Sequence, residues 1–217
     1  FEWSDGQSGQ TITVSPTETT TYTLTYTAYS GCIDTDDVVV TVNSLPSVDV
    51  ALIGDSIICK GDVTNLNLDF SGIGPWTFIG SDGPGDTTAF EHLDANSQLP
   101  LSPETSRTYT IWYLIDEATG CADSVNKSVS IIVNPLPDGN IKVLTNNVIC
   151  KGDSSVLEII FTGSGLWSYI GTSGIDTSLI ENISEDTIIS GFLPDITRTY
   201  TLLYVKDEIT GCEQYMN

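Results

Sequence analysis

Five cysteines are the side chains of this sequence best suited to covalent chemistry. Four of them form two pairs of equal spacing, because Cys59 and Cys121 are 62 residues apart and so are Cys150 and Cys212. This spacing predicts two disulfide bonds, Cys59–Cys121 and Cys150–Cys212, and it leaves Cys32 unpaired. Free buried thiols or a metal site are the alternative, but the chain has no Cys-x-x-Cys pair. Regularly spaced disulfides indicate an oxidising compartment outside the cell.

Acidic residues are the second group with chemical potential, since 29 acidic residues against 7 basic ones give a formal net charge of -22. Calcium prefers oxygen ligands and is the one metal that this acidity favours, although no EF-hand loop is present. The candidate calcium ligands are Asp34, Asp36, Asp37, Asp82 and Asp86. No other cofactor is expected. The same charge repels phosphate and anionic lipid, so it argues against nucleic-acid binding and leaves cationic partners open.

Catalysis is not expected from the remaining polar residues. His92 is the only histidine, and position 183, which corresponds to it one repeat later, is Ile183. This argues against Ser-His-Asp and Cys-His arrangements. The carboxylate pairs Asp116-Glu117 and Asp207-Glu208 each lie shortly before a Gly-Cys dipeptide, and we interpret them as solvated turn formers. The sequence therefore predicts a protein that is not an enzyme.

Internal repeats determine how the chain is organised, because separate blocks return after 91 residues. Cys-Lys-Gly-Asp occurs at 59–62 and 150–153, and Arg-Thr-Tyr-Thr occurs at 107–110 and 198–201. A partial third copy opens the chain. We therefore expect three repeats: 1–46, truncated at its start; 47–137, complete; and 138–217, lacking its last strand. The Pro-containing segments 42–46 and 133–137 are expected to be short, stiff linkers.

Apolar residues alternate with polar ones along each repeat, as Leu66, Leu68 and Phe70 do, which predicts strands. In the complete repeat the expected strands are 48–53, 63–70, 76–80, 87–92, 97–102, 108–115 and 125–133. Seven short strands in about 90 residues indicate an immunoglobulin-like β-sandwich. The fold class is therefore all-β, with tandem immunoglobulin-like repeats and a period of about 91 residues. The chain has no apolar run of about 18 residues, so no segment is expected to cross a membrane.

Aromatic residues give expectations for the core and for the surface. Trp76 recurs as Trp167, which favours packing inside the sandwich over sugar binding. Tyr109, Ile111 and Tyr113 alternate along the sixth strand of the complete repeat and are expected to face the core. The opposite row, which includes Trp112 and Leu114, is apolar as well. It is covered either by the segment inserted before this strand or by a lateral protein contact.

The order of motifs in each repeat resembles the Ig-like (PKD-like) repeats of very large Bacteroidetes surface proteins. The order is Cys-x-Gly-Asp, a Trp-centred strand, Ser-Asp-Gly, Pro-x-x-x-x-Thr-Tyr-Thr, Gly-Cys and Val-x-Val-Asn-x-x-Pro. The resemblance covers the whole chain. It implies a structural stalk in a cell-surface adhesin, including SprB-like adhesins of gliding motility that are exported by type IX secretion. The later repeats depart from the pattern by ten additional residues before the Thr-Tyr-Thr strand.

The resemblance also implies glycan acceptors, because Bacteroidetes modify Asp-(Ser/Thr) followed by a small or aliphatic residue. Such triplets also arise by chance in a chain this rich in Asp, Ser and Thr. The candidate acceptors are Ser56, Thr87, Ser124 and Thr187.

Two functions are favoured by the sequence, and a third, an accessory domain of an enzyme, would need a catalytic domain outside these residues. The first is a spacer of a secreted, cell-surface adhesin or filament whose partners are the neighbouring repeats. The second is a glycan- or protein-binding module of a secreted multidomain protein. An exposed Trp112 or Trp76 would favour binding, and burial of both would favour the spacer.

Overall fold

The computed structural model describes residues 1–83 and 86–216, without the side chains of 90–92 and 190–192. All regular elements among the described residues are β-strands. His92 is one of the residues whose side chains are not described, so the prediction that it takes no part in catalysis lies outside the described residues. The all-β fold class predicted from two-residue periodicity is confirmed. In this part of the chain, no helix has the length and apolar character that crossing a bilayer requires.

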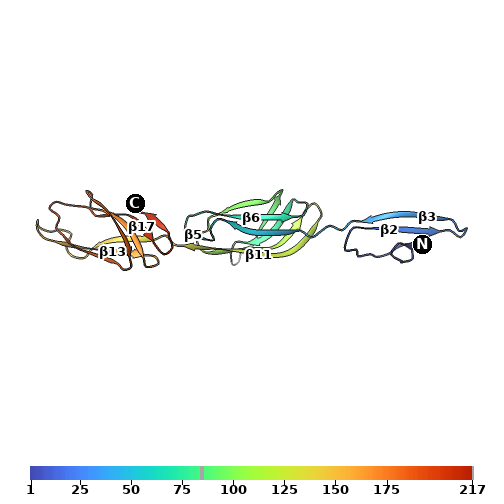
Figure 1. The fold of residues 1–217 in the computed structure, drawn as a ribbon, viewed down its shortest axis with the longest axis horizontal. Coiled ribbons are helices and arrows are strands. Elements are labelled where there is room, and N and C mark those ends of the chain that lie inside the picture. The colour runs from blue at the N-terminus through green and yellow to red at the C-terminus, as the bar shows by residue number, and fades with distance from the viewer. Residues whose placement is uncertain (84–85, 217) are drawn as a thin grey trace. The chain divides into compact units, whose positions relative to one another are not determined.

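The first segment forms one three-stranded sheet with the order β1-β2-β3. Its strands are β1 (Glu2–Trp3), β2 (Thr20–Thr27) and β3 (Ile33–Val40). Strands β2 and β3 run antiparallel side by side, with Tyr22 opposite Val38 (Figure 1). Tyr22 is buried, whereas most of β3 is exposed.

Residues 47–134 form two sheets. The first has the order β4-β6-β9, with β4 (Ser47–Ile53), β6 (Thr64–Ser71) and β9 (Ser97–Leu101). The second has the order β5-β11-β10-β7-β8, with β5 (Ile57–Cys59), β11 (Cys121–Asn134), β10 (Arg107–Asp116), β7 (Trp76–Ser81) and β8 (Thr88–Leu93). All seven expected strands are present. The prediction missed β5, a three-residue strand that pairs in parallel with the end of β11.

Residues 138–216 repeat this plan in two further sheets. One has the order β12-β13-β16, with β12 (Asp138–Val143), β13 (Ser155–Thr162) and β16 (Thr187–Phe192). The other has the order β15-β14-β17-β18, with β15 (Thr177–Ile183), β14 (Trp167–Thr172), β17 (Thr201–Asp207) and β18 (Glu213–Tyr215). We call the structure of residues 47–134 the middle sandwich and that of residues 138–216 the third sandwich. Their strand order is the immunoglobulin-like arrangement.

The two tryptophans lie in the sandwich cores, as predicted. Trp76 of β7 is 7% exposed and stacks on Phe70 of β6, with ring centroids 5.1 Å apart. Trp167 of β14 stacks on Phe161 of β13 in the same way, at 5.3 Å. In each sandwich this contact joins one sheet to the other. Aromatic pairs of this kind add about 1 kcal/mol beyond the apolar area that they bury.

The prediction for the inward face of β10 is wrong over its second half. Ile111 is buried, but the next buried residue is Leu114 rather than Tyr113, which is exposed. The pairing of β10 with β7 shifts by one residue between Ile111 and Tyr113, so a β-bulge inverts the alternation beyond it. Strand β17 shows the same change, because Leu202 and Val205 are both buried and a shift occurs opposite them. Each bulge turns a later Asp inward, Asp116 in β10 and Asp207 in β17.

The chain divides into two compact units whose segments interleave. One unit comprises Phe1–Val50, Leu68–Ser97 and Thr110–Ser128; the other comprises Ala51–Asn67, Gln98–Tyr109 and Val129–Asn217. The three consecutive repeats with boundaries after residues 46 and 137 stay a prediction. Pro46 and Pro137, the last residues of the two expected linkers, are fully buried.

Candidate functional site: the cysteine turns

The structure pairs the cysteines differently from the sequence prediction. Cys59 is bonded to Cys212, with their Cα atoms 5.5 Å apart, so neither predicted bond is formed. Cys121 and Cys150 are free, and Cys32 is free and exposed. Equal spacing suggested bonds within each repeat, and the strands explain why that inference failed.

Strand β11 separates the two cysteines that were expected to pair in the middle repeat. Cys121 is the first residue of β11, whereas Cys59 lies opposite Asn134, its last residue. A strand of this length spans about 40 Å at about 3.3 Å per residue. Because a disulfide requires Cα atoms within about 7 Å, Cys59 and Cys121 cannot bond. The two pairs are equally spaced because the sequence repeats, and not because their members are in contact.

Cys59 belongs to a turn fixed by an aspartate. The Cys59 amide donates to Oδ2 of Asp62 at 3.0 Å, and the Asp62 amide donates back to the Cys59 carbonyl at 3.0 Å. Gly61 has φ 95°, a left-handed conformation that glycine adopts without strain. The Lys60 amide donates to the Asn134 carbonyl, which attaches the turn to the end of β11. We call residues 59–62 and their counterpart 150–153 the Lys-Gly turns.

The second Lys-Gly turn has the same geometry around a free thiol. The Cys150 amide donates to Oδ2 of Asp153 at 3.3 Å, and the Asp153 amide donates to the Cys150 carbonyl at 3.0 Å. Gly152 has φ 97°. Cys150 is thus positioned like Cys59 within its turn but carries no disulfide.

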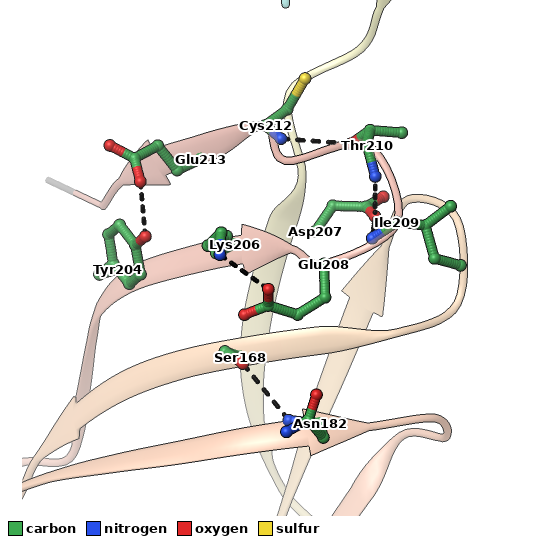
Figure 2. Close-up of polar contacts among 10 residues, drawn as sticks. All are labelled: Ser168, Asn182, Tyr204, Lys206, Asp207, Glu208, Ile209, Thr210, Cys212 and Glu213. Atoms are coloured by element: carbon green, nitrogen blue, oxygen red, sulfur yellow. Dashed lines mark hydrogen bonds and ion pairs between the residues drawn. The ribbon is translucent and has the colours of Figure 1, made fainter.

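Cys212 ends a different turn, which connects β17 to β18 (Figure 2). Oδ1 of Asp207 accepts hydrogen bonds from the amides of Ile209 at 2.9 Å and Thr210 at 3.1 Å. The Cys212 carbonyl accepts from the Asp207 amide at 2.8 Å, and the Cys212 amide donates to the Thr210 hydroxyl at 3.3 Å. Figure 2 shows the Cys212 sulfur pointing away from these contacts. We call residues 207–212 and their counterpart 116–121 the Asp-Cys turns.

Asp207 and Asp116 are buried, so interpreting them as solvated turn formers was wrong. Each is 1% exposed. Oδ2 of Asp207 accepts from the Ser164 amide at 2.6 Å, and Oδ2 of Asp116 accepts from the Ile73 amide at 2.7 Å. Each carboxylate therefore attaches its Asp-Cys turn to the loop that precedes the core tryptophan.

A glycine makes room for each carboxylate. A Cβ atom on Gly163 would lie 2.7 Å from Oδ2 of Asp207, and one on Gly72 would lie 2.6 Å from Oδ2 of Asp116. The motif Phe-x-Gly-x-Gly-x-Trp occurs at 70–76 and again 91 residues later at 161–167, and in both places the Asp stands 40 residues after the Trp. This recurrence is the sequence feature that would have identified the buried aspartates.

Hydrogen bonds stabilise the ionised form of both aspartates. The pKa of Asp116 is lowered chiefly by the hydrogen bond from the Ile73 amide, with further donation from Thr119, against the opposing effect of burial. Burial raises the pKa of Asp207, but the amides of Ser164, Thr210 and Ile209 together outweigh it, and the net shift is downward. A carboxylate that accepts several amide hydrogen bonds is favoured in its charged form.

A smaller polar network lies on β17 beside the Asp-Cys turn that ends at Cys212. Nζ of Lys206 lies 2.7 Å from Oε2 of Glu208. This contact, with a hydrogen bond from Ser168, lowers the pKa of Glu208, and it raises the pKa of Lys206. Tyr204 donates its hydroxyl to Glu213 at 2.7 Å, and its pKa is raised by burial and by that carboxylate. Tyr204 therefore links β17 to β18, and Lys206 links β17 to the Asp-Cys turn.

The candidate calcium ligands do not converge. Asp34, Asp36 and Asp37 lie on β3, and the first two each accept a hydrogen bond from the amide of the next residue. Asp82 and Asp86 flank residues 84–85, which the structure does not describe. Within residues 1–83 and 86–216, no three His, Cys, Asp or Glu side chains gather closely enough to hold a metal ion.

The candidate glycan acceptors differ in accessibility. Ser56, Thr87 and Ser124 are exposed, whereas Thr187 is half-buried at the start of β16. Ser124 lies within β11. Asp186, which precedes Thr187, accepts a hydrogen bond from the Phe161 amide at 3.0 Å.

Comparison with known proteins gives similarity at the level of solved structures. No protein-family model matches the chain, and no curated protein matches it. An I-band fragment of titin is similar with a TM-score of 0.46 and 13% identity, over 80% of this chain and 64% of the fragment. The human OSCAR ligand-binding domain gives a TM-score of 0.29 and 13% identity, over 76% of this chain and 89% of that one. Escherichia coli alpha-2-macroglobulin activated by porcine elastase gives 0.32 and 9%, over 93% of this chain and 24% of that one.

Proposed function

We propose that the chain is a structural spacer in a long extracellular adhesin or filament, built from immunoglobulin-like sandwiches joined by disulfides. The observation that carries the proposal is the Cys59–Cys212 bond, which connects a turn of the middle sandwich to a turn of the third. A disulfide inside one domain stabilises that domain alone. A disulfide from one sandwich to the next restricts the segment between them.

The construction of the two turns supports this function. The Lys-Gly turn is hydrogen-bonded to Asn134 at the end of β11, and the Asp-Cys turn is attached through Asp207 to the loop that precedes Trp167 in the third sandwich. Both cysteines are therefore held by the folded structure around them. This arrangement suits a spacer, because in a quasi-one-dimensional array each repeat is in contact only with its neighbours.

Small-angle X-ray scattering tests the spacer directly. We expect an elongated particle with a maximum dimension of about 100 Å, because a sandwich with ten-residue strands advances about 35 Å. A compact 217-residue globule would have a radius of gyration of about 17 Å. A measured radius near that value would contradict the proposal.

A binding module is the second candidate, and one observation favours it. Trp112 on β10 is 39% exposed and its neighbour Tyr113 is also exposed, whereas Trp76 is buried. Aromatic rings of this kind form the contacts of glycan- and protein-binding surfaces. Replacing Trp112 with Ala and measuring retention on immobilised glycans, against the unaltered chain, distinguishes the two functions. Specific retention that disappears with Trp112 would favour the binding module.

A further inference from the structure

A groove of about 750 Å³ lies in the third sandwich between residues 146–151 and 194–200. The corresponding segments of the middle sandwich are β5 with its flanks and the start of β10. There, the two segments are not neighbours, because β11 lies between them in the order β5-β11-β10. The groove thus occupies the place that a strand fills in the middle sandwich.

The walls of the groove show the effect of the open position. Ile57–Cys59 forms β5 and pairs with residues 132–134, and Ile58 is buried. Residues 148–150 have nearly the same sequence, Val-Ile-Cys, but form no strand, and Val148 is 82% exposed. Because the local sequences match, the difference comes from the neighbouring strand and not from intrinsic propensity.

A free thiol lies at the edge of this groove. Ile149 and Lys151 line it, and Cys150 between them is free and exposed. In the middle sandwich the last residue of β11 lies opposite Cys59, whose sulfur is bonded to the following sandwich through Cys212. A strand in the groove would end beside Cys150 in the same way.

We propose that the groove and Cys150 together form an acceptor site for a further sandwich of the same kind. The occupant is one polypeptide segment: a strand with the side-chain pattern of Val129–Asn134, followed by a sandwich that carries an Asp-Cys turn. The strand continues the course of β18 and fills the groove parallel to residues 148–150. The cysteine of the Asp-Cys turn then bonds to Cys150. This inference deepens the proposed spacer function.

Bond formation is a thiol–disulfide exchange with a small disulfide such as glutathione disulfide. The Cys150 thiolate attacks one sulfur of glutathione disulfide, and one glutathione thiolate leaves. The incoming cysteine thiolate attacks the Cys150 sulfur of this mixed disulfide and releases the second glutathione. Two protein thiols are oxidised, one glutathione disulfide is reduced to two thiols, and the two protons leave with them.

The experiment extends the chain with its own sequence. A second copy of residues 127–217 is attached after residue 217, because Asn217 matches Asn126 in the repeat. The product is oxidised with a glutathione redox buffer and digested without reduction. We expect a peptide that joins Cys150 to the added copy of Cys212, while the Cys59–Cys212 bond is unchanged. A free Cys150, or its bonding to any other cysteine, would overturn the acceptor site.

A shorter extension tests the groove without the bond. Attaching only a copy of residues 127–135 should slow amide hydrogen exchange at residues 148–150 by tenfold or more. In the matched control, the added copy carries Asp at the position of Ile131, which is buried in β11, and it should give no protection. Equal exchange with and without the extension would overturn the strand position. Peptide mapping reads the bond and scattering reads particle shape, so this inference and the spacer function can fail separately.

Discussion

Two buried aspartates hold together parts of each sandwich that are far apart in the sequence. Asp116 and Asp207 each accept hydrogen bonds from their own Asp-Cys turn and from the loop before the core tryptophan. Single removal of such an acceptor leaves several amides unsatisfied, at about 1–3 kcal/mol each when they are buried. These two carboxylates therefore fix the position of each Asp-Cys turn and of the cysteine at its end.

The pH dependence of stability tests these carboxylates. Because the folded pKa of both lies below the ordinary value of 3.8, their contribution is present above about pH 4 and is lost as the pH falls through the folded pKa. We expect the double variant Asp116→Asn and Asp207→Asn to unfold at lower urea than the unaltered chain at pH 7. The difference between the urea midpoints of the two proteins should be smaller at pH 2.5 than at pH 7. Asp55→Asn, at an exposed position, is the control, and an unchanged difference at low pH would contradict the assignment.

Gly163 tests the space beside the carboxylate. Gly163→Ala places a Cβ against Oδ2 of Asp207 and 2.9 Å from Nε1 of Trp167, at φ 139°. We expect it to lower the free energy of unfolding by about 3 kcal/mol, from overpacking and backbone strain together. Gly165→Ala is the matched control, because its φ is also positive, 100°, but nothing lies within 4 Å of the added carbon. Denaturant unfolding of both variants gives the comparison, and equal losses would mean that the carboxylate contact contributes nothing.

At the scale of elements, the sequence was sufficient for the strands that have an alternating pattern and insufficient for those that depend on a partner. All seven predicted strands of the middle sandwich exist, because each carries its own alternation. Strand β5 was missed, since three residues carry no period and β11 determines their conformation. The disulfide was mispredicted because the length of β11, rather than cysteine spacing, separates Cys59 from Cys121. The buried aspartates were missed because a bulge cannot be seen in alternation.

Because of the bulge in β10, we expect two neighbouring residues to differ in how much they contribute to the free energy of unfolding. Leu114 is fully buried, so Leu114→Ala should cost about 2–5 kcal/mol of unfolding free energy. Tyr113→Ala should cost less, about 1 kcal/mol, because Tyr113 is exposed. Thermal unfolding of the two variants decides between this register and uninterrupted alternation, which would make Tyr113 the more costly change.

At the scale of the whole molecule, the Cys59–Cys212 bond closes a loop over a sequence separation of 153 residues. The chain-entropy model assigns such a loop about 5 kcal/mol. We expect Cys59→Ser with Cys212→Ser to lower the melting temperature and to abolish its dependence on reducing agent. Calorimetry with and without dithiothreitol measures both effects. Cys32→Ser is the control, because Cys32 is free, and a melting temperature that still responds to dithiothreitol in the double variant would contradict the pairing.

The same bond changes how the chain would carry a pulling force applied at its two ends. Tension entering from Phe1 reaches Cys59 and passes through the two sulfurs to Cys212, so residues 60–211 lie outside the loaded path. An unprotected stretch of that length would extend by about 500 Å on unfolding, at up to about 3.5 Å per residue. While the bond is intact, residues 60–211 cannot be extended by the force, and reduction of the bond makes their full length available. The redox state of one cysteine pair would therefore set the extensibility of most of the chain.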